Sequence, residues 1–71
     1  MNIPEARILR LPEVRRRTGL GTTSVYRLIK TGQFPRPVQL VGPTVGWRAD
    51  EIDQWIVERP RTSESRLPET R

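Results

Sequence analysis

The feature that most constrains this chain is a leucine between two glycines, Gly19-Leu20-Gly21, with helical patterns on both sides. A glycine can end a helix in the left-handed conformation, and the leucine then fills the gap between two helices that meet at a sharp turn. The first helix is predicted over 12–18, with Pro12 in its first turn. The second is predicted over 22–31. The pattern therefore indicates two helices joined by a three-residue turn.

A β-hairpin is predicted after the second helix. Apolar residues alternate over 38–40 and 45–47, on either side of a Gly-Pro turn, and a period of two is typical of strands. A proline-containing spacer at 34–37 is predicted to be stiff and extended. The short apolar run at 8–11 is predicted to form an edge strand.

A third helix is predicted to begin at Asp50 and to end before Pro60. Asp50 and Asp53 have the spacing of a capping box, with an acid in each role. Three apolar residues repeat at the spacing of a buried helix face: Ile52, Trp55 and Ile56. Both Trp47 and Trp55 are predicted to lie in the core, because each falls on the apolar phase of its element.

The predicted fold class is mainly α with a small β-hairpin, in the layout of a winged helix-turn-helix. A chain of 71 residues fits one domain. We place that domain at 8–59, between a flexible N-terminal lead-in at 1–7 and a disordered C-terminal tail at 60–71. The tail is rich in Ser, Thr, Glu, Arg and Pro, a composition that buries too little apolar surface to become ordered.

The composition argues against several classes of function. The chain contains no histidine and no cysteine, so it lacks the commonest general base, thiolate metal ligands and disulfides. No nucleophile–base pair stands out, and we expect neither an enzyme nor a metal, cofactor or small-molecule substrate. No secretory signal or membrane-spanning run is apparent. We expect a cytoplasmic protein associated with the bacterial nucleoid.

Charge is distributed unevenly along the chain, whose net charge is +5. Residues 7–48 contain nine Arg or Lys and one acid, whereas residues 49–59 contain four acids and one arginine. This asymmetry favours a surface that faces a polyanion, and double-stranded DNA is the expected partner. The alternative is a basic surface that serves only solubility.

The second predicted helix carries most of the candidate DNA contacts. At 100° per residue, Thr23, Arg27 and Lys30 lie opposite an inward face of Val25, Leu28 and Ile29. Arg27 could bind guanine through two hydrogen bonds, while Lys30 suits a phosphate. The full set of candidates on this helix is Thr22, Thr23, Ser24, Tyr26, Arg27 and Lys30. Alternatively, the three hydroxyl residues cap the helix and Tyr26 is half-buried.

The remaining candidates lie on the first helix and around the hairpin. Arg16 belongs to an arginine run at 15–17 and could contact a phosphate or simply be solvated. Arg36, Thr44 and Arg48 flank the hairpin or lie at its tip, where a wing could touch the DNA backbone. Arg48 could instead neutralise the acidic first turn of the third helix. We expect that third helix to face away from DNA.

The sequence resembles the AlpA-like prophage regulatory proteins, small winged proteins related to phage excisionases and to the DNA-binding domain of MerR-type regulators. The resemblance rests on ILRLPEV at 8–14, RTGL at 17–20, SVYRLIK at 24–30, GQFP at 32–35, VGWR at 45–48 and EIDQWI at 51–56. It implies a transcriptional regulator of a prophage or integrated mobile element. Gly21 departs from the pattern, because the family usually has a serine or similar cap there.

Two further functions remain open from the sequence. An excisionase, or recombination directionality factor, would bend attachment-site DNA and help to recruit an integrase. A protein-interaction adaptor in phage assembly would use the same fold without DNA. For a regulator, one module covers only a short site, so useful specificity is expected to need a dimer or side-by-side copies on DNA.

Overall fold

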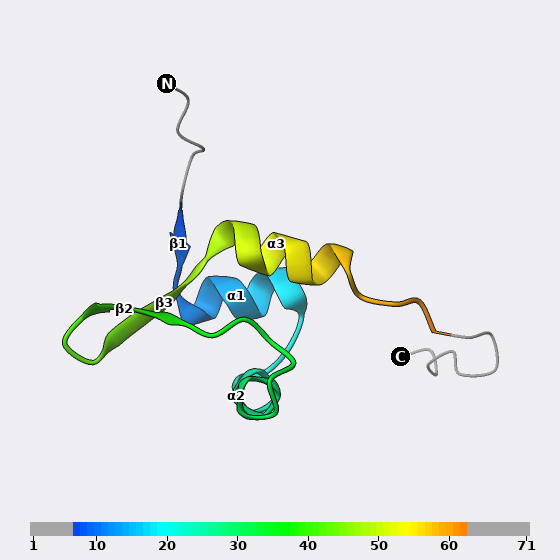
Figure 1. Ribbon diagram of the computed structural model, residues 1–71, viewed down its shortest axis with the longest axis horizontal. Coiled ribbons are helices and arrows are strands. Elements are labelled where there is room, and N and C mark those ends of the chain that lie inside the picture. Colours follow the sequence, from blue (N-terminus) through cyan, green and yellow to red (C-terminus); the bar gives the residue numbers. More distant parts are fainter. Residues whose placement is uncertain (1–6, 63–71) are drawn as a thin grey trace, which may run out of the picture.

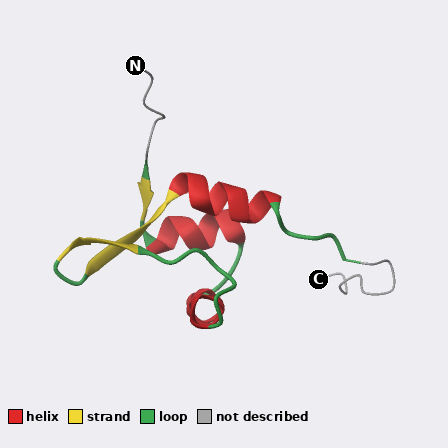
Figure 2. Ribbon diagram, in the orientation of Figure 1, coloured by secondary structure: helices red, strands yellow, loops and turns green. Residues whose placement is uncertain are grey.

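The computed structural model describes residues 7–62, so most of the predicted lead-in and tail lie outside the described residues. The described part contains three helices and a three-stranded antiparallel sheet (Figures 1 and 2). The elements follow in the order β1 (Ile8–Leu9), α1 (Leu11–Thr18), α2 (Thr22–Lys30), β2 (Val38–Val41), β3 (Thr44–Arg48) and α3 (Ala49–Val57).

The two glycine-joined helices form as predicted, with each boundary within one residue. Helix α1 begins at Leu11, because the carbonyl oxygen of Arg10 already accepts hydrogen bonds from the backbone of the first turn. It ends at Gly19, whose φ of 77° is the left-handed conformation that glycine adopts readily. Helix α2 ends at Lys30, since the backbone of Thr31 leaves the helical conformation and its hydroxyl bonds back to the last turn. Between these helices Leu20 packs against the core, as predicted.

The start of α3 differs from the prediction, and the proposed Asp50–Asp53 capping box is wrong. Arg48 occupies the cap position and no side chain caps the helix. Strand β3 instead runs directly into α3, and the backbone N–H of Ala49 donates to the carbonyl oxygen of Arg7 at 2.9 Å. The backbone N–H of Ala49, which precedes the proposed box, is thus satisfied by the chain segment just before β1.

The sheet has the order β1-β3-β2, so β3 is central. Leu9 pairs with Trp47 across the β1–β3 ladder, and Val38 pairs with Gly46 across the β2–β3 ladder. The expected hairpin is thus present, with an irregular register between Gln39 and Val41. The predicted edge strand at 8–11 also forms, over Ile8–Leu9, and joins the hairpin into one sheet, so the described residues form a small α/β domain of three helices and a three-stranded antiparallel sheet.

The core takes residues from every element except β2. Its buried members are Leu9, Val14, Val25, Phe34, Trp47, Ala49 and Ile52. The indole N–H of Trp47 donates to the carbonyl oxygen of Pro35 at 3.1 Å, and that of Trp55 donates to Gln33 at 2.8 Å. Both tryptophans therefore hold the 33–37 spacer against the domain. Trp47 is fully buried as predicted, whereas Trp55 is half-buried.

Candidate nucleic-acid interface

Helix α2 presents the polar side that the sequence predicted. Thr23, Arg27 and Lys30 are exposed, while Val25 is completely buried and Leu28 and Ile29 pack partly against the core. Gly21 is the cap residue, and no side chain donates or accepts a capping hydrogen bond. Capping therefore does not engage the hydroxyls of the first turn, Thr22, Thr23 and Ser24.

Tyr26 lies on the flank of α2 that faces the sheet. Its ring meets Trp47 of β3 edge-on, with the ring centroids 6.4 Å apart and the planes inclined by 63°. The side chain remains 44% exposed. Part of the ring thus belongs to the packing between α2 and β3, as the half-buried alternative predicted, and the rest is exposed.

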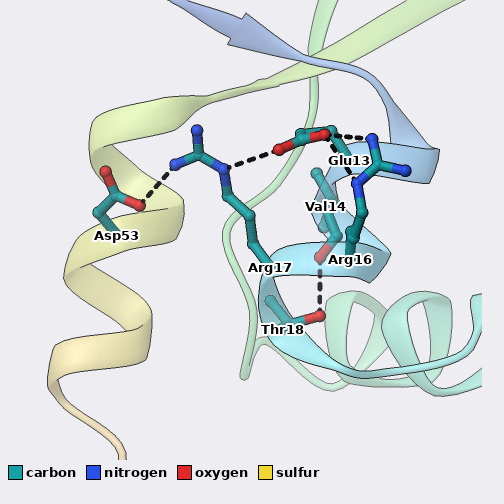
Figure 3. Close-up of polar contacts among 6 residues, drawn as sticks. All are labelled: Glu13, Val14, Arg16, Arg17, Thr18 and Asp53. Carbon is teal, nitrogen blue, oxygen red and sulfur yellow. Dashed lines mark hydrogen bonds and ion pairs between the residues drawn. The ribbon is translucent and has the colours of Figure 1, made fainter.

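A single carboxylate on α1 pairs with two of the three arginines of the 15–17 run (Figure 3). Glu13 accepts hydrogen bonds from Arg16, with its Nε at 3.1 Å, and from the Nε of Arg17 at 3.3 Å. The Nη1 of Arg17 also contacts Asp53 of α3 at 3.0 Å. These hydrogen bonds hold the pKa of Glu13 below its ordinary value of 4.5, and the bond from Arg16 has a larger effect than the bond from Arg17. Two of the three arginines are therefore engaged within the protein.

Arg15 is the member of the run that the prediction passed over. Within residues 7–62 it forms no ion pair, and it borders a shallow hollow beside the Gly19–Gly21 turn that leads into α2. Arg16, the predicted phosphate contact, borders the same hollow but is paired with Glu13. The sequence could have predicted which arginines are paired, because on a helix Glu13 can reach residues three and four positions ahead but not residue 15.

The three candidates near the hairpin differ in their surroundings. Arg48 pairs with Asp50, at 2.8 Å from Nη2 to Oδ2, and this hydrogen bond raises the pKa of Arg48 and lowers that of Asp50. The alternative role of Arg48, neutralising the first turn of α3, is therefore what the geometry shows. Thr44 is half-buried in β3, and Arg36 is exposed in the spacer.

The basic and acidic helices lie on opposite sides of α1. In Figure 1, α3 runs above α1, while α2 is seen end on below it. Helix α2 adds Arg27 and Lys30, which form no ion pair within residues 7–62. Helix α3 has acids in its first turn and no basic residue in its last. The domain thus has a side that attracts a polyanion and a side that repels one.

Other kinds of site find little support in the part of the chain described. Residues 7–62 hold no cluster of three potential metal ligands. Each helix in the same range is too short or too polar to cross a bilayer. No polar or charged side chain of these residues is buried, so the polar chemistry lies on the surface.

Comparison with known proteins gives one family and two relatives. Residues 7–60 match the family described as prophage CP4-57 regulatory protein (AlpA). The chain is 40% identical over 58 residues to the uncharacterized protein ORF88 of Enterobacteria phage P4, a match that covers 82% of this chain and 66% of that protein. The phage protein is therefore longer than the matched region.

The second relative carries a functional name. The chain is 34% identical over 64 residues to the DNA-binding transcriptional activator AlpA of Escherichia coli (strain K12), a match that covers 82% of this chain and 91% of the relative. No solved structure matches the chain significantly.

Proposed function

Because the chain belongs to the AlpA family of prophage regulatory proteins, we propose that it is a sequence-specific, double-stranded DNA-binding transcriptional regulator of a prophage or integrated element. Family membership confirms the resemblance drawn from the sequence motifs. The family is one of regulators, which also confirms the expectation that the protein is not an enzyme.

We assign α1, the turn, α2 and the β2–β3 hairpin to the winged helix-turn-helix class. In that class, the N-terminal part of the second helix meets base edges in the major groove. Here that part carries three hydroxyl residues, and the outward face continues with Arg27 and Lys30. Arg27 is proposed to read a guanine and Lys30 to contact a phosphate.

The observation that carries the proposal is that some cations of α1 and α2 form no ion pair within the described residues, while other arginines of the domain do. Arg16, Arg17 and Arg48 each contact a carboxylate of the protein, whereas Arg15, Arg27 and Lys30 contact none within residues 7–62. A cation with no internal partner can exchange its counterions for DNA phosphates without first breaking a bond. Arg15 therefore joins the proposed contact set, flanking α2.

The hairpin contributes less charge to the proposed contact than a wing often does. Arg36 precedes it and is exposed, and Thr44 offers a hydroxyl near the tip. Arg48 is held by Asp50. We propose that Arg36 adds one phosphate contact at the base of the wing, that Thr44 near its tip and Tyr26 on α2 add polar contacts, and that α2 supplies the sequence preference.

The test is to select bound sequences from a pool of random duplexes and then to titrate salt against the selected duplex. We expect affinity to fall steeply with salt, and a selected site to bind on the order of a thousandfold more tightly than a scrambled duplex. Binding without sequence preference, or no salt-dependent binding at all, would contradict the proposal. The second outcome would favour the adaptor function.

A further inference from the structure

Strand β1 lies at an edge of the sheet, and its outer side is open. In the order β1-β3-β2, β3 covers one side of β1 and no strand within residues 7–62 covers the other. Ile8 pairs with Arg48. One step along the same register, the carbonyl oxygen of Arg7 accepts a hydrogen bond from the backbone N–H of Ala49. Hydrogen-bonded and non-hydrogen-bonded pairs alternate along an antiparallel ladder, so the N–H and carbonyl of Ile8 point away from β3, towards the open edge.

A shallow hollow, which we call the β1 hollow, follows this open edge. One wall is β1 with the residues that flank it, and the other is the exposed side of α1. Two arginines line each wall, Arg7 and Arg10 beside β1 and Arg16 and Arg17 on α1. No residue of β2 or β3 lines it, so the hollow lies on the side of β1 that β3 leaves uncovered. An extended segment in the β1 hollow would therefore continue the sheet.

The β1 hollow carries an excess of positive charge. On the α1 wall, Glu13 binds both arginines, and Arg17 also binds Asp53 of α3 (Figure 3). On the β1 wall, Arg7 and Arg10 are exposed and form no ion pair within the described part of the chain. Two guanidinium groups thus remain for an anionic partner, one on each side of Ile8.

The chemistry of the edge favours a polypeptide over DNA as that partner. The carbonyl of Ile8 needs a hydrogen-bond donor, and a DNA backbone offers acceptors only, whereas a polypeptide supplies both an N–H and a carbonyl. Strand β1 also extends from the start of α1 towards the side on which α3 lies, away from α2 (Figure 1). A duplex held by α2 therefore lies on the other side of α1.

We propose that the open edge of β1 is a docking site for an extended, acidic segment of a partner protein, which adds a strand to the sheet. The N–H and carbonyl of Ile8 bind the backbone of that segment, and Arg7 and Arg10 pair with its carboxylates. The site goes beyond the proposed function and does not depend on it. It leaves α2 free to hold DNA while the partner is bound.

The test measures hydrogen exchange of the Ile8 amide by NMR, because exchange reports on the N–H that the proposal engages. The probe is a capped peptide of alternating glutamate and threonine, about eight residues long. One control peptide has glutamine in place of glutamate and so lacks the charge. A second has proline in place of threonine, which keeps the charge but removes backbone donors and disfavours strand pairing.

The variants separate the two arginines of β1 from charge elsewhere. Arg7→Gln, Arg10→Gln removes the proposed charge pairs. Arg59→Gln, Arg61→Gln is the matched control, because it removes the same charge from exposed positions beyond α3. Circular dichroism establishes that each variant is folded, and Arg10→Gln alone serves if the double variant unfolds.

We expect the glutamate–threonine peptide to slow exchange of the Ile8 amide about twofold when half of the protein is occupied. The β1 double variant should bind this peptide roughly fivefold more weakly, and the control variant should bind it as wild type does. An unprotected Ile8 amide would overturn the proposal, as would equal protection by either control peptide or equal weakening in the control variant. Protection of Ile8 by duplex DNA would place DNA at this edge and overturn it too. These outcomes leave the proposed function untouched, because none of them measures binding by α2.

Discussion

Helices α2 and α3 are built alike and differ mainly in what they expose. Each has nine residues, each lacks a side-chain cap, and each buries one central aliphatic residue completely, Val25 in α2 and Ile52 in α3. Outside, α2 carries Arg27 and Lys30 and α3 carries a series of acids. The buried residue anchors each helix in the core, and the exposed residues decide which of the two helices can face a polyanion.

The two helices also differ in how their charges are used. The acids of α3 bind arginines of α1 and β3, through the pairs Arg17–Asp53 and Arg48–Asp50. The cations of α2 bind no acid within residues 7–62. Two acids of α3 are thus paired within the domain, whereas the cations of α2 remain available for a partner.

The largest expected effect is on stability, and it comes from truncating the buried aliphatic side chain that each helix contributes to the core. Ile52→Ala should lower the free energy of unfolding by about 2–5 kcal/mol, because it leaves a cavity in a fully buried position. Urea denaturation followed by circular dichroism measures the change. Val57→Ala on the exposed side of α3 is the control and should shift stability by less than about 0.5 kcal/mol. Similar losses from the two variants would show that α3 is not packed as described.

The roles of the two helices in DNA binding can be compared by removing one arginine from α2 and one from the end of α3. Arg27→Ala should weaken binding to a selected duplex by roughly 1–3 kcal/mol and relax the base preference at one position. Arg59→Ala removes the same charge just beyond α3, where the guanidinium lies over the Trp55 ring at 4.1 Å, and should preserve the preference. Gel-shift titrations against a set of single-base variants of the site measure both quantities. Unchanged affinity and preference in Arg27→Ala would exclude it as a base reader.

A smaller effect should separate paired from unpaired arginines on α1. Arg15→Ala should weaken DNA binding uniformly across sequences and reduce the slope of log affinity against log salt by about 0.9. Arg16→Ala should change the slope less, because Glu13 already neutralises that side chain. Fluorescence anisotropy at a series of salt concentrations gives both slopes. If Arg16 rather than Arg15 controls the slope, the internal pairing does not decide which arginine meets phosphate.

The smallest effect concerns the pH dependence of α3. The hydrogen bond from Arg48 lowers the pKa of Asp50 in the folded protein below its ordinary value of 3.8. The ionised carboxylate therefore stabilises the fold above that ordinary value, and the contribution is lost as the pH falls through the lowered pKa. Asp50→Asn should be slightly less stable than wild type near neutrality and should show a shallower loss below pH 4. Parallel acid titrations that monitor ellipticity test this, and identical curves would contradict it.

Much of the fold followed from local patterns. The glycine-bracketed turn, the inward stripe of α2 and the hairpin each depend on residues a few positions apart, and each was predicted within one or two residues. Interactions between distant residues were not predictable in this way. The spacing of Asp50 and Asp53 suggested a cap, but packing brings Arg17 to Asp53, and Arg7, just before β1, accepts a hydrogen bond from the first residue of α3.

The candidate site divides in a similar manner. The exposed face of α2 could be predicted because helical phase alone determines it. The state of the arginine run could have been predicted in part, since Glu13 reaches Arg16 and Arg17 at helical spacing. The way in which Ile8 and Leu40 both lie close to Gly46 could not, because the three residues belong to three different strands. A repeat pattern within one segment does not predict a contact between different strands.

The position of β1 has a consequence for how the protein is made. Ile8 pairs with Arg48, forty positions further along the chain, so β1 leaves the ribosome well before the strand with which it pairs. Contacts of such long sequence separation slow folding, because the intervening chain must be closed into a loop first. The two early helices can form sooner, but the sheet that contains Trp47 is completed later. Newly made chains should therefore acquire their native structure in one late step, after β3 and the core residues of α3 have emerged.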